Sequence, residues 1–248
     1  MKIDHPLPGD IAALRQLWKE AFGDTDAFLD TFFATVFRCD HCLCIREQEA
    51  ILAAAYWMDC QIDRREAAYI YAVATAESRR GRGLCRTLMD EIHAILRQRG
   101  YCGTVLVPGD PDLRQMYGAM GYRNFGGIRE FSCNAGETAV PMQKITPEAF
   151  AILRRQYLPE HAVIQEGAQL ALLGTLAAFY RGKDFILTLS RDGGRVLELL
   201  GNETNAPAIT NALGISSALF RKAGTQPFAM YLPLNDGIFP TYFAFAFD

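Results

Sequence analysis

A strand, a basic glycine-rich turn and an amphipathic helix follow one another directly between Tyr69 and Ile92. The run from Tyr69 to Thr75 is apolar and of strand length, and Arg79 to Gly83 form a flexible, positively charged turn. Apolar residues then recur on one helix face, at Leu84, Leu88, Ile92, Ile95 and Leu96. Backbone N–H groups at the start of such a helix point at one spot, with the positive end of the helix dipole behind them. This segment therefore predicts a site for a pyrophosphate.

The spacing of the turn separates the known phosphate-binding motifs. A P-loop requires Gly-x-x-x-x-Gly-Lys followed by Ser or Thr, and the chain contains no such run. A dinucleotide fingerprint requires a third glycine after Gly81 and Gly83, and none follows at the required place. The pattern that fits is Arg80-Gly-Arg-Gly-Leu-Cys85.

This run resembles the pyrophosphate loop of the GNAT acetyltransferases, Gln/Arg-x-x-Gly-x-Gly/Ala, which holds the coenzyme A diphosphate on backbone amides. Cys85 is a departure, because the family usually has Gly or Ala at that position. The resemblance implies that the strand end and the turn bind the coenzyme, through Val73, Ala74, Thr75, Arg80, Gly81, Arg82, Gly83, Leu84, Cys85 and Arg86.

A second motif follows the next expected strand, which lies within residues 100–107. Asp110 ahead of a proline is a helix-start signal, and we count it among the cofactor-binding residues. A helical stripe then contains Leu113, Met116, Tyr117 and Met120. Tyr117-Gly-Ala-Met-Gly-Tyr122 resembles the GNAT pattern Tyr-x-x-x-Gly-Phe/Tyr. The resemblance implies that Tyr117 lies beside the coenzyme sulfur as the general acid, whereas the ordinary alternative is a half-buried helix tyrosine.

Composition excludes several other functions. The formal charge of -3 and the pI near 5.9 argue against a nucleic-acid-binding domain, whose surface would be basic. No apolar run has the length of a membrane span, and the N-terminus lacks the apolar core of a signal peptide. We therefore expect a cytoplasmic protein without a membrane partner.

The seven cysteines are scattered and odd in number, as expected of reduced thiols. Cys39, His41, Cys42 and Cys44 form a cluster, but the second ligand pair of a usual zinc site is missing. We interpret these cysteines as buried free thiols and expect no metal. His93, on the helix after the basic turn, is interpreted as a surface or packing residue.

The first half of the chain predicts an α/β fold with a mixed sheet. Helices are expected over 10–22, with Asp10 as the cap, and over 25–37. The strands expected before the phosphate turn are 42–46, 51–58 and 69–75, and a last strand is expected at 128–133. The resemblance assigns this order to a GNAT acyl-CoA acyltransferase fold in a domain of residues 1–134, whose sheet splays beside the strand 69–75 to admit the coenzyme.

Residues 135–248 predict a smaller α+β domain. Residues 134–139 suit a linker. Helices are expected over 146–157, 165–180 and 207–222, and strands over 185–190, 195–200, 228–232 and 241–248. The order echoes the first half without a basic glycine turn, so we interpret it as a degenerate GNAT-like domain that shapes the acceptor pocket; an unrelated α+β domain is the alternative.

This plan resembles the enhanced-intracellular-survival type of GNAT protein, although the chain is too short to include that group's sterol-carrier-like domain. In that group the terminal carboxylate can act as the catalytic base, a role that would here fall to Asp248.

The sequence thus predicts an N-acetyltransferase that moves an acetyl group from acetyl-CoA, its cosubstrate, to a primary amine of a small molecule or peptide. The amine attacks the thioester directly. No base stands out: Asp59 and Glu66 precede the central strand and could act through a water, but are more ordinarily hairpin carboxylates. A non-catalytic acyl-CoA-binding sensor or scaffold and a transferase of longer acyl chains stay open, as do the acceptor and a homo-oligomeric state.

Overall fold

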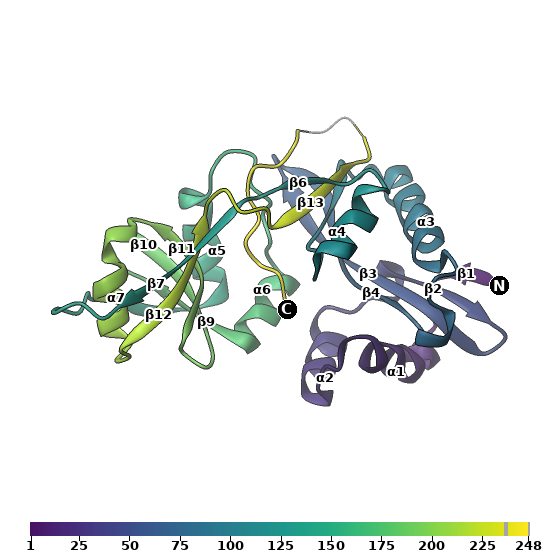
Figure 1. The fold of residues 1–248 in the computed structure, drawn as a ribbon, viewed down its shortest axis with the longest axis horizontal. Coiled ribbons are helices and arrows are strands. Elements are labelled where there is room, and N and C mark those ends of the chain that lie inside the picture. Colours follow the sequence, from purple (N-terminus) through teal and green to yellow (C-terminus); the bar gives the residue numbers. More distant parts are fainter. Residues whose placement is uncertain (236–237, 248) are drawn as a thin grey trace. The chain divides into compact units, whose positions relative to one another are not determined.

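A computed structural model describes residues 1–235 and 238–247, and the chain folds into two compact units (Figure 1). The first unit combines Met1–Arg123 with Tyr231–Ile238. The second combines Asn124–Met230 with the chain from Phe239 onward. Each unit is built around one β-sheet that contains both parallel and antiparallel pairs.

The first sheet has seven strands in the order β1-β2-β3-β4-β5-β13-β6. Their bounds are β1 (Lys2–Asp4), β2 (Cys42–Glu47), β3 (Ala50–Ile62), β4 (Arg65–Thr75), β5 (Gly103–Leu106), β13 (Ala229–Pro233) and β6 (Arg123–Phe125). The helices are α1 (Ile11–Phe22), α2 (Asp26–Thr35), α3 (Leu84–Gln98) and α4 (Pro111–Gly118), with short 3-10 turns at Pro8–Asp10, Cys39–His41 and Glu77–Arg79. Strands β1 to β4 pair antiparallel, and β5 runs parallel to β4.

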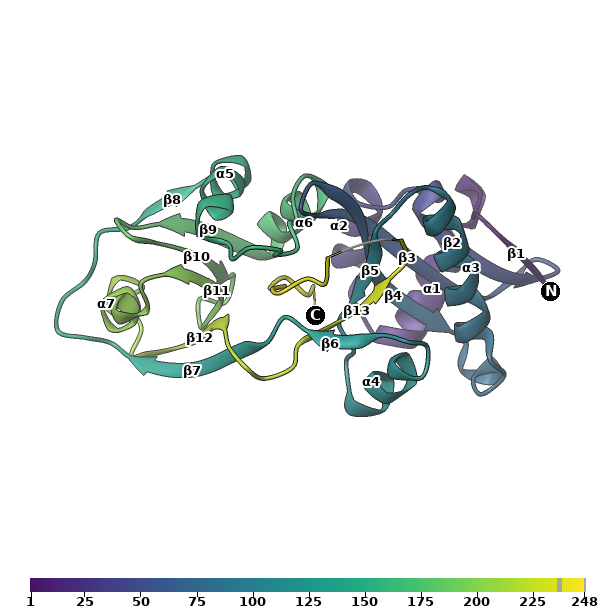
Figure 2. The same ribbon diagram turned by 90° about the horizontal axis from the view of Figure 1, so that it is seen from above.

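Helices α1 and α2 cover one face of this sheet and α3 covers the other (Figures 1 and 2). Trp18 of α1 lies at the centre of an aromatic cluster, with ring centroids 4.7 Å from Phe32, 5.0 Å from Tyr56 and 5.7 Å from Tyr71. On the opposite face α3 buries the predicted stripe except Ile95, which is half-buried, and two further residues, Met89 and His93. The apolar periodicity of both helix faces therefore builds a core on each side of the sheet.

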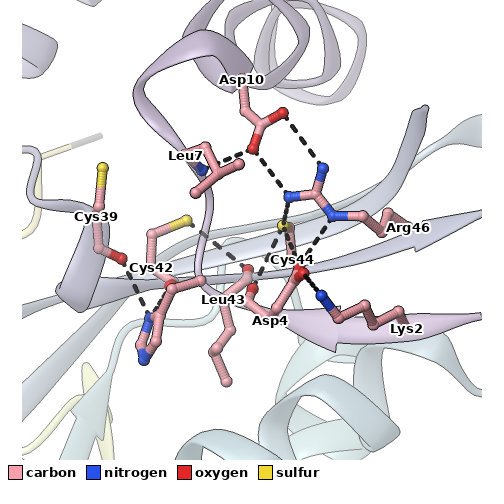
Figure 3. A network of polar contacts seen from close by, with 10 residues as sticks. Lys2, Asp4, Leu7, Asp10, Cys39, Cys42, Leu43, Cys44 and Arg46 are labelled. Atoms are coloured by element: carbon pink, nitrogen blue, oxygen red, sulfur yellow. Dashed lines mark hydrogen bonds and ion pairs between the residues drawn. The ribbon is translucent and has the colours of Figure 1, made fainter. Parts of the chain in front are cut away.

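A polar network fixes the N-terminal segment to β2 (Figure 3). The Arg46 guanidinium donates from Nε to Asp4 and from Nη2 to Asp10, both at 2.9 Å. Asp10 also accepts from the Leu7 N–H at 2.7 Å. Its side chain makes no capping bond to α1, so the predicted capping role of Asp10 is wrong, because the carboxylate is engaged by Arg46. The Cys44 thiol lies in the same network, 3.4 Å from the Asp4 carbonyl oxygen.

The β3–β4 hairpin is longer and tighter than the sequence predicts. Its turn consists of Asp63 and Arg64, which both have positive φ, as a type I′ hairpin turn requires. The strand pairs continue up to this turn, whereas the sequence analysis ended one strand at residue 58 and began the next at residue 69.

The second sheet has six strands in the order β7-β12-β11-β10-β9-β8. Their bounds are β7 (Ile128–Asn134), β12 (Ser217–Ala223), β11 (Arg195–Gly201), β10 (Phe185–Ser190), β9 (Ala177–Arg181) and β8 (Gln143–Ile145). The helices are α5 (Pro147–Tyr157), α6 (Ala168–Leu176) and α7 (Ala206–Ala212), with a 3-10 turn at Glu203–Asn205.

The two units share one order of elements. In the first, β1, two helices, β2, β3 and β4 precede α3 and a strand parallel to β4. In the second, β8, two helices, β9, β10 and β11 precede α7 and a strand parallel to β11. The sheet orders agree as well, because each four-strand antiparallel run ends beside the parallel strand.

Several expectations for the second half are wrong. The strand after Ile128 pairs with β12 in the second sheet, and residues 135–136 are bonded into a loop of that unit instead of linking two domains. The helix expected over 165–180 ends at Leu176, since β9 has the alternating burial of a strand. The helix expected over 207–222 likewise ends at Ala212, before β12.

The closing aromatic run is buried but is not the strand that its alternation predicted. Tyr242, Phe243, Ala244 and Phe245 are all almost completely buried, on both sides of the segment. Its backbone bonds go to single residues of a loop, for example from the Val163 N–H to the Tyr242 oxygen at 2.9 Å.

Candidate functional site

The pairing between β4 and β5 is short. It joins Ala68 to Thr104 and Tyr69 to Val105, and beyond Tyr69 the described strands leave that side of β4 open. On its other side β4 stays paired with β3 as far as Thr75. The open edge therefore offers backbone N–H and C=O groups to a ligand that lies along it.

A β-bulge lies within this open stretch. Tyr71 pairs with Tyr56 and Ala74 with Ala54, so two residues of β4 face one residue of β3. Ala72, the first residue of the bulge, has φ +50°, a conformation that is rare for residues with a side chain. Bulges bend a strand and increase its twist, so the bulge carries the end of β4 away from β5.

The basic turn connects this strand end to α3. Gly81 has φ +73° and Gly83 has φ +76°, and a Cβ atom at either position would meet no described atom within 4 Å. The first helical bond of α3 runs from the Thr87 N–H to the Gly83 oxygen at 3.0 Å. The N–H groups of the residues between them therefore precede the helical ladder and point out of the helix end. The turn is thus open above both glycines and presents backbone donors.

The arginines of the turn differ in their partners. Arg79 forms an ion pair with Glu47 at 2.9 Å. Arg80 donates from Nε to the Thr75 oxygen at 3.2 Å, which ties the turn to the end of β4. Arg86 donates to the Ala119 oxygen at 3.2 Å. Arg82 is exposed and forms no hydrogen bond or ion pair with another described side chain, so its charge is available to an anion.

Cys85 lies half-buried in the first turn of α3. Burial raises the pKa of its thiol to about 11. The thiol is therefore neutral at physiological pH, and the departure from Gly or Ala adds no negative charge beside the turn.

Helix α4 carries the second motif. The Asp110 side chain accepts from the Leu113 N–H at 2.7 Å and caps the helix. This bond explains Asp110 as a capping residue, and its role as a coenzyme ligand stays a prediction. Tyr117 is the one buried residue of α4, whereas Leu113 of the predicted stripe is exposed.

Tyr117 lies close to the first turn of α3. Burial, together with the nearby Cys85, raises the pKa of the Tyr117 phenol, so the hydroxyl keeps its proton at neutral pH. That hydroxyl forms no hydrogen bond with any other residue that the structure describes. The bond from Arg86 to Ala119 links α3 to the residue that directly follows α4. The structure thus brings the two motifs together, as their resemblance to one family required.

The ring of Tyr122 packs on that of Tyr117, and the Tyr122 hydroxyl belongs to a group of three buried polar side chains. The sequence analysis did not identify this group. The Tyr122 hydroxyl is 2.8 Å from His93 Nε2 and 2.8 Å from Thr104 Oγ1. Burial lowers the pKa of His93 to about 4, so the imidazole is neutral. His93 is thus a buried hydrogen-bonding residue; its position one residue after Ile92, at the border of the apolar stripe, was the available signal.

The two carboxylates considered as bases lie at the far end of the sheet. Glu66 precedes Val73 by seven residues of β4, which is roughly 20 Å of strand. Asp59 pairs with Ala68 and accepts from the Tyr101 hydroxyl at 2.5 Å. Both belong to the β3–β4 hairpin. Asp248 lies outside the described residues.

The corresponding turn of the second unit has no basic donors. It joins β11 to α7, and Glu203 within it forms ion pairs with Arg129 and Lys222. Gly201 at its start has φ +96°, and a Cβ there would lie 2.3 Å from the Asp184 oxygen. The backbone above Gly201 is therefore occupied, and this turn carries Glu203 where the turn of the first unit carries arginines.

Comparison with known proteins agrees with the geometry of the first unit. Residues 3–125 match the family of acetyltransferase (GNAT) domains. The N-terminal half of this chain is a GNAT acetyltransferase domain. The predicted family and fold class are therefore confirmed, and the GNAT domain belongs to a family of acyltransferases. No curated protein gives a significant match.

Solved structures resemble nearly the whole chain in fold. A GCN5-related N-acetyltransferase from Anabaena variabilis has a TM-score of 0.76 at 16% identity, over 94% of this chain and 73% of its own. A probable N-acyltransferase from Enterococcus faecalis has a TM-score of 0.71 at 14% identity, with coverages of 94% and 72%. Eis1 from Mycobacterium abscessus has a TM-score of 0.68 at 12% identity, with coverages of 92% and 66%. At these identities the likeness concerns the fold alone.

Two features of the described residues bear on other kinds of site. No group of three or more His, Cys, Asp or Glu side chains gathers there in an arrangement that would hold a metal ion. Within the same residues, no helix is long and apolar enough to cross a bilayer.

Proposed function

We propose that this chain transfers an acetyl group from acetyl-CoA to a primary amine, by direct attack of the neutral amine on the thioester. The observation that carries the proposal is the opened edge of β4, which leads to a turn lined by backbone donors and ends beside Tyr117. A strand edge suits the amides of the pantetheine arm, and the turn suits the diphosphate.

The coenzyme would lie along residues 73–75, with its diphosphate over Gly81 to Arg86. The bulge at Ala72 supports this placement, because it bends the strand end away from β5. The exposed Arg82 and Arg80, of which only Arg80 Nε is bonded to Thr75, would add positive charge beside the backbone donors. Backbone N–H groups near Val73 would also polarise the thioester carbonyl.

Tyr117 would protonate the departing thiolate. The phenol is protonated at neutral pH, as a general acid must be, and its raised pKa makes it a weaker acid than a free tyrosine. Asp59 and Glu66 are too far along the sheet to take the amine proton, so we propose neither of them as the base.

We also propose that the second unit is a degenerate GNAT-like domain that binds no coenzyme. The shared order of elements supports common architecture, and the filled acidic turn at Gly201–Glu203 supports the lack of a diphosphate site.

The test combines binding with turnover. Calorimetric titration with coenzyme A should give one site per chain, and acetyl-CoA with a panel of aliphatic, aromatic and peptide amines should release free thiol. Propionyl-CoA and longer acyl-CoA esters would define the acyl preference. Binding without turnover across the panel would contradict the enzyme and favour a sensor, whereas two sites per chain would contradict the proposal for the second unit.

A further inference from the structure

The Tyr122 hydroxyl connects three elements of the first unit. It lies 2.8 Å from His93 on α3 and 2.8 Å from Thr104 on β5, while Tyr122 itself directly follows the turn that ends α4. The exposed fractions of the three residues are 3% for Tyr122, 6% for His93 and 0% for Thr104. The motif that contains Tyr122 accepts Phe at this position, so this hydroxyl is a feature of the present chain beyond the motif.

Tyr122 is also the direct neighbour of Tyr117. Gly121, with φ +98°, turns the chain back, and the Tyr122 N–H then donates to the backbone carbonyl oxygen of Tyr117 at 3.1 Å. The two rings pack edge to face, with centroids 5.7 Å apart and an interplanar angle of 67°. Since the Tyr117 hydroxyl has no hydrogen bond within the described chain, its position depends on the packing of its ring.

The hydrogen bonds among Tyr122, His93 and Thr104 can all form while the three side chains are uncharged. A neutral imidazole offers one acceptor nitrogen, so Tyr122 can donate to His93 Nε2 while it accepts from Thr104. All three groups then have partners in a buried place, where an unsatisfied polar group would be costly. Such a network holds the Tyr122 ring in one orientation.

We propose that Tyr122 is a positioning residue for the acyl transfer, and that its hydroxyl, held by His93 and Thr104, fixes the ring against which Tyr117 packs. The inference rests on the proposed function, in which the Tyr117 hydroxyl must meet the departing thiolate. In this proposal Tyr122 acts only through Tyr117 and contacts neither the coenzyme nor the amine.

The first test is a double-mutant cycle. Tyr122→Phe keeps the ring but removes the hydroxyl, and Tyr101→Phe is the matched control because it removes the hydrogen bond to Asp59 at the far end of the sheet. Tyr122→Phe should lower kcat about ten- to a hundredfold, with the KM for the amine and the coenzyme affinity unchanged. In the Tyr117→Phe background the same change should have no further effect on kcat. An equal loss in both backgrounds, or an unchanged kcat, overturns the inference.

The second test does not depend on turnover. In protein labelled with 3-fluorotyrosine, the ¹⁹F resonance of Tyr117 is identified by its absence from the Tyr117→Phe variant. Tyr122→Phe should shift or broaden this resonance, although the ring that packs on Tyr117 remains, whereas Tyr101→Phe should leave it in place. If no amine is acetylated but the resonance responds, the proposed function fails and the positioning stands. An unchanged resonance overturns the positioning even in an active enzyme.

Discussion

Gly83 is the residue on which the proposed diphosphate site depends most directly. Its φ of +76° strains any other residue, and the space above it is open. Gly100 follows the other end of α3 with φ +83° and equally open surroundings. The two positions therefore share backbone conformation and space but lie at opposite ends of one helix.

We expect Gly83→Val and Gly100→Val to destabilise the protein by a similar amount, about 1 to 3 kcal/mol. Only Gly83→Val should weaken coenzyme A binding, because only there would the side chain fill the space over the backbone donors. Calorimetric titration and urea unfolding of both variants provide the comparison. Equal affinities in the two variants would place the diphosphate elsewhere.

Tyr117 gives a kinetic prediction. Tyr117→Phe keeps the buried ring and removes the acidic proton, so kcat should fall by roughly a hundred- to ten-thousandfold. Coenzyme affinity should be nearly unchanged, because the ring packing is retained. Single-turnover measurements should locate the loss in the chemical step; equal rates for both proteins would remove Tyr117 from the mechanism.

His93 gives a prediction for the pH dependence of stability. Its folded-state pKa of about 4 is below the ordinary value of 6.5, so between these values the unfolded chain binds more protons. The contribution of neutral His93 to the free energy of unfolding is complete above pH 6.5 and is lost as the pH falls toward 4. The loss amounts to about 3 kcal/mol over this window.

The check is urea unfolding of the wild-type protein and His93→Phe at several pH values, followed by tryptophan fluorescence. Both tryptophans, Trp18 and Trp57, lie in the first unit, so the signal reports its unfolding. The wild-type free energy of unfolding should fall more steeply below pH 6.5 than that of the variant. Parallel profiles would show that His93 does not titrate in this way.

Among the secondary-structure elements, β4 differs on its two sides: its backbone pairs with β3 along one side, and the end of its other side is left open by β5. The bulge at Ala72, with φ +50°, lies where the strand opens. Gln48, in the turn between β2 and β3, has nearly the same φ, +54°, away from the opening. Substitutions at these two residues therefore distinguish the effect of backbone strain on stability from the effect of the bulge on coenzyme binding.

Ala72→Val should destabilise the protein by about 1 to 3 kcal/mol and weaken coenzyme binding, because a β-branched residue disfavours the bulge conformation. Gln48→Val should cost similar stability and leave the coenzyme affinity unchanged. Ala72→Gly should retain both properties, since glycine adopts positive φ readily. Thermal unfolding and calorimetry measure the two effects, and unaltered binding by Ala72→Val would show that the bulge does not shape the site.

The sequence predicted the elements whose pattern is local. The α3 face from Leu84 to Leu96 and the turn before it follow from periodicity and glycine spacing, and both are confirmed. The bulge at Ala72 gave no signal, because an alanine among apolar residues is typical of a regular strand. The His93 network was equally hidden, since its three members come from elements that only the fold brings together.

In the second half of the chain, sequence patterns predicted several elements wrongly. Its helices over 165–180 and 207–222 were predicted too long because short runs such as Ala177–Arg181 suit either period. The closing segment alternates in sequence like a strand, yet Tyr242 and Phe243 are buried on both sides without a ladder. Tertiary packing, which the local pattern does not contain, determines the secondary structure of these segments.

At the scale of the whole molecule, the first unit is not a continuous segment. Strand β13 comes from far along the chain and lies between β5 and β6 in the first sheet. The Tyr231 hydroxyl donates to the Cys102 oxygen at 3.2 Å, and it packs so closely on Gly103 that a Cβ there would lie 2.2 Å from the hydroxyl oxygen. Asn235 also donates to the Tyr101 oxygen at 2.9 Å.

A fragment of residues 1–134 should therefore fail to fold, because β5 would lose its neighbour and expose an unpaired edge. The same fragment, extended through a flexible Gly/Ser linker by residues 227–235, should regain a cooperative thermal transition. Circular dichroism and tryptophan fluorescence distinguish the two. A cooperative transition in the short fragment would show that β13 is dispensable.

The late strand also has a consequence for the newly made protein. Roughly one hundred residues separate β6 from β13, and a ribosome adds these in about 5 to 20 s. During that interval the acetyltransferase sheet has every strand except the one that fills the place beside β5, so a nascent chain carries a vacant sheet edge while the second half is still being synthesised. Chaperone demand and translation speed over that stretch should then govern the yield of active protein.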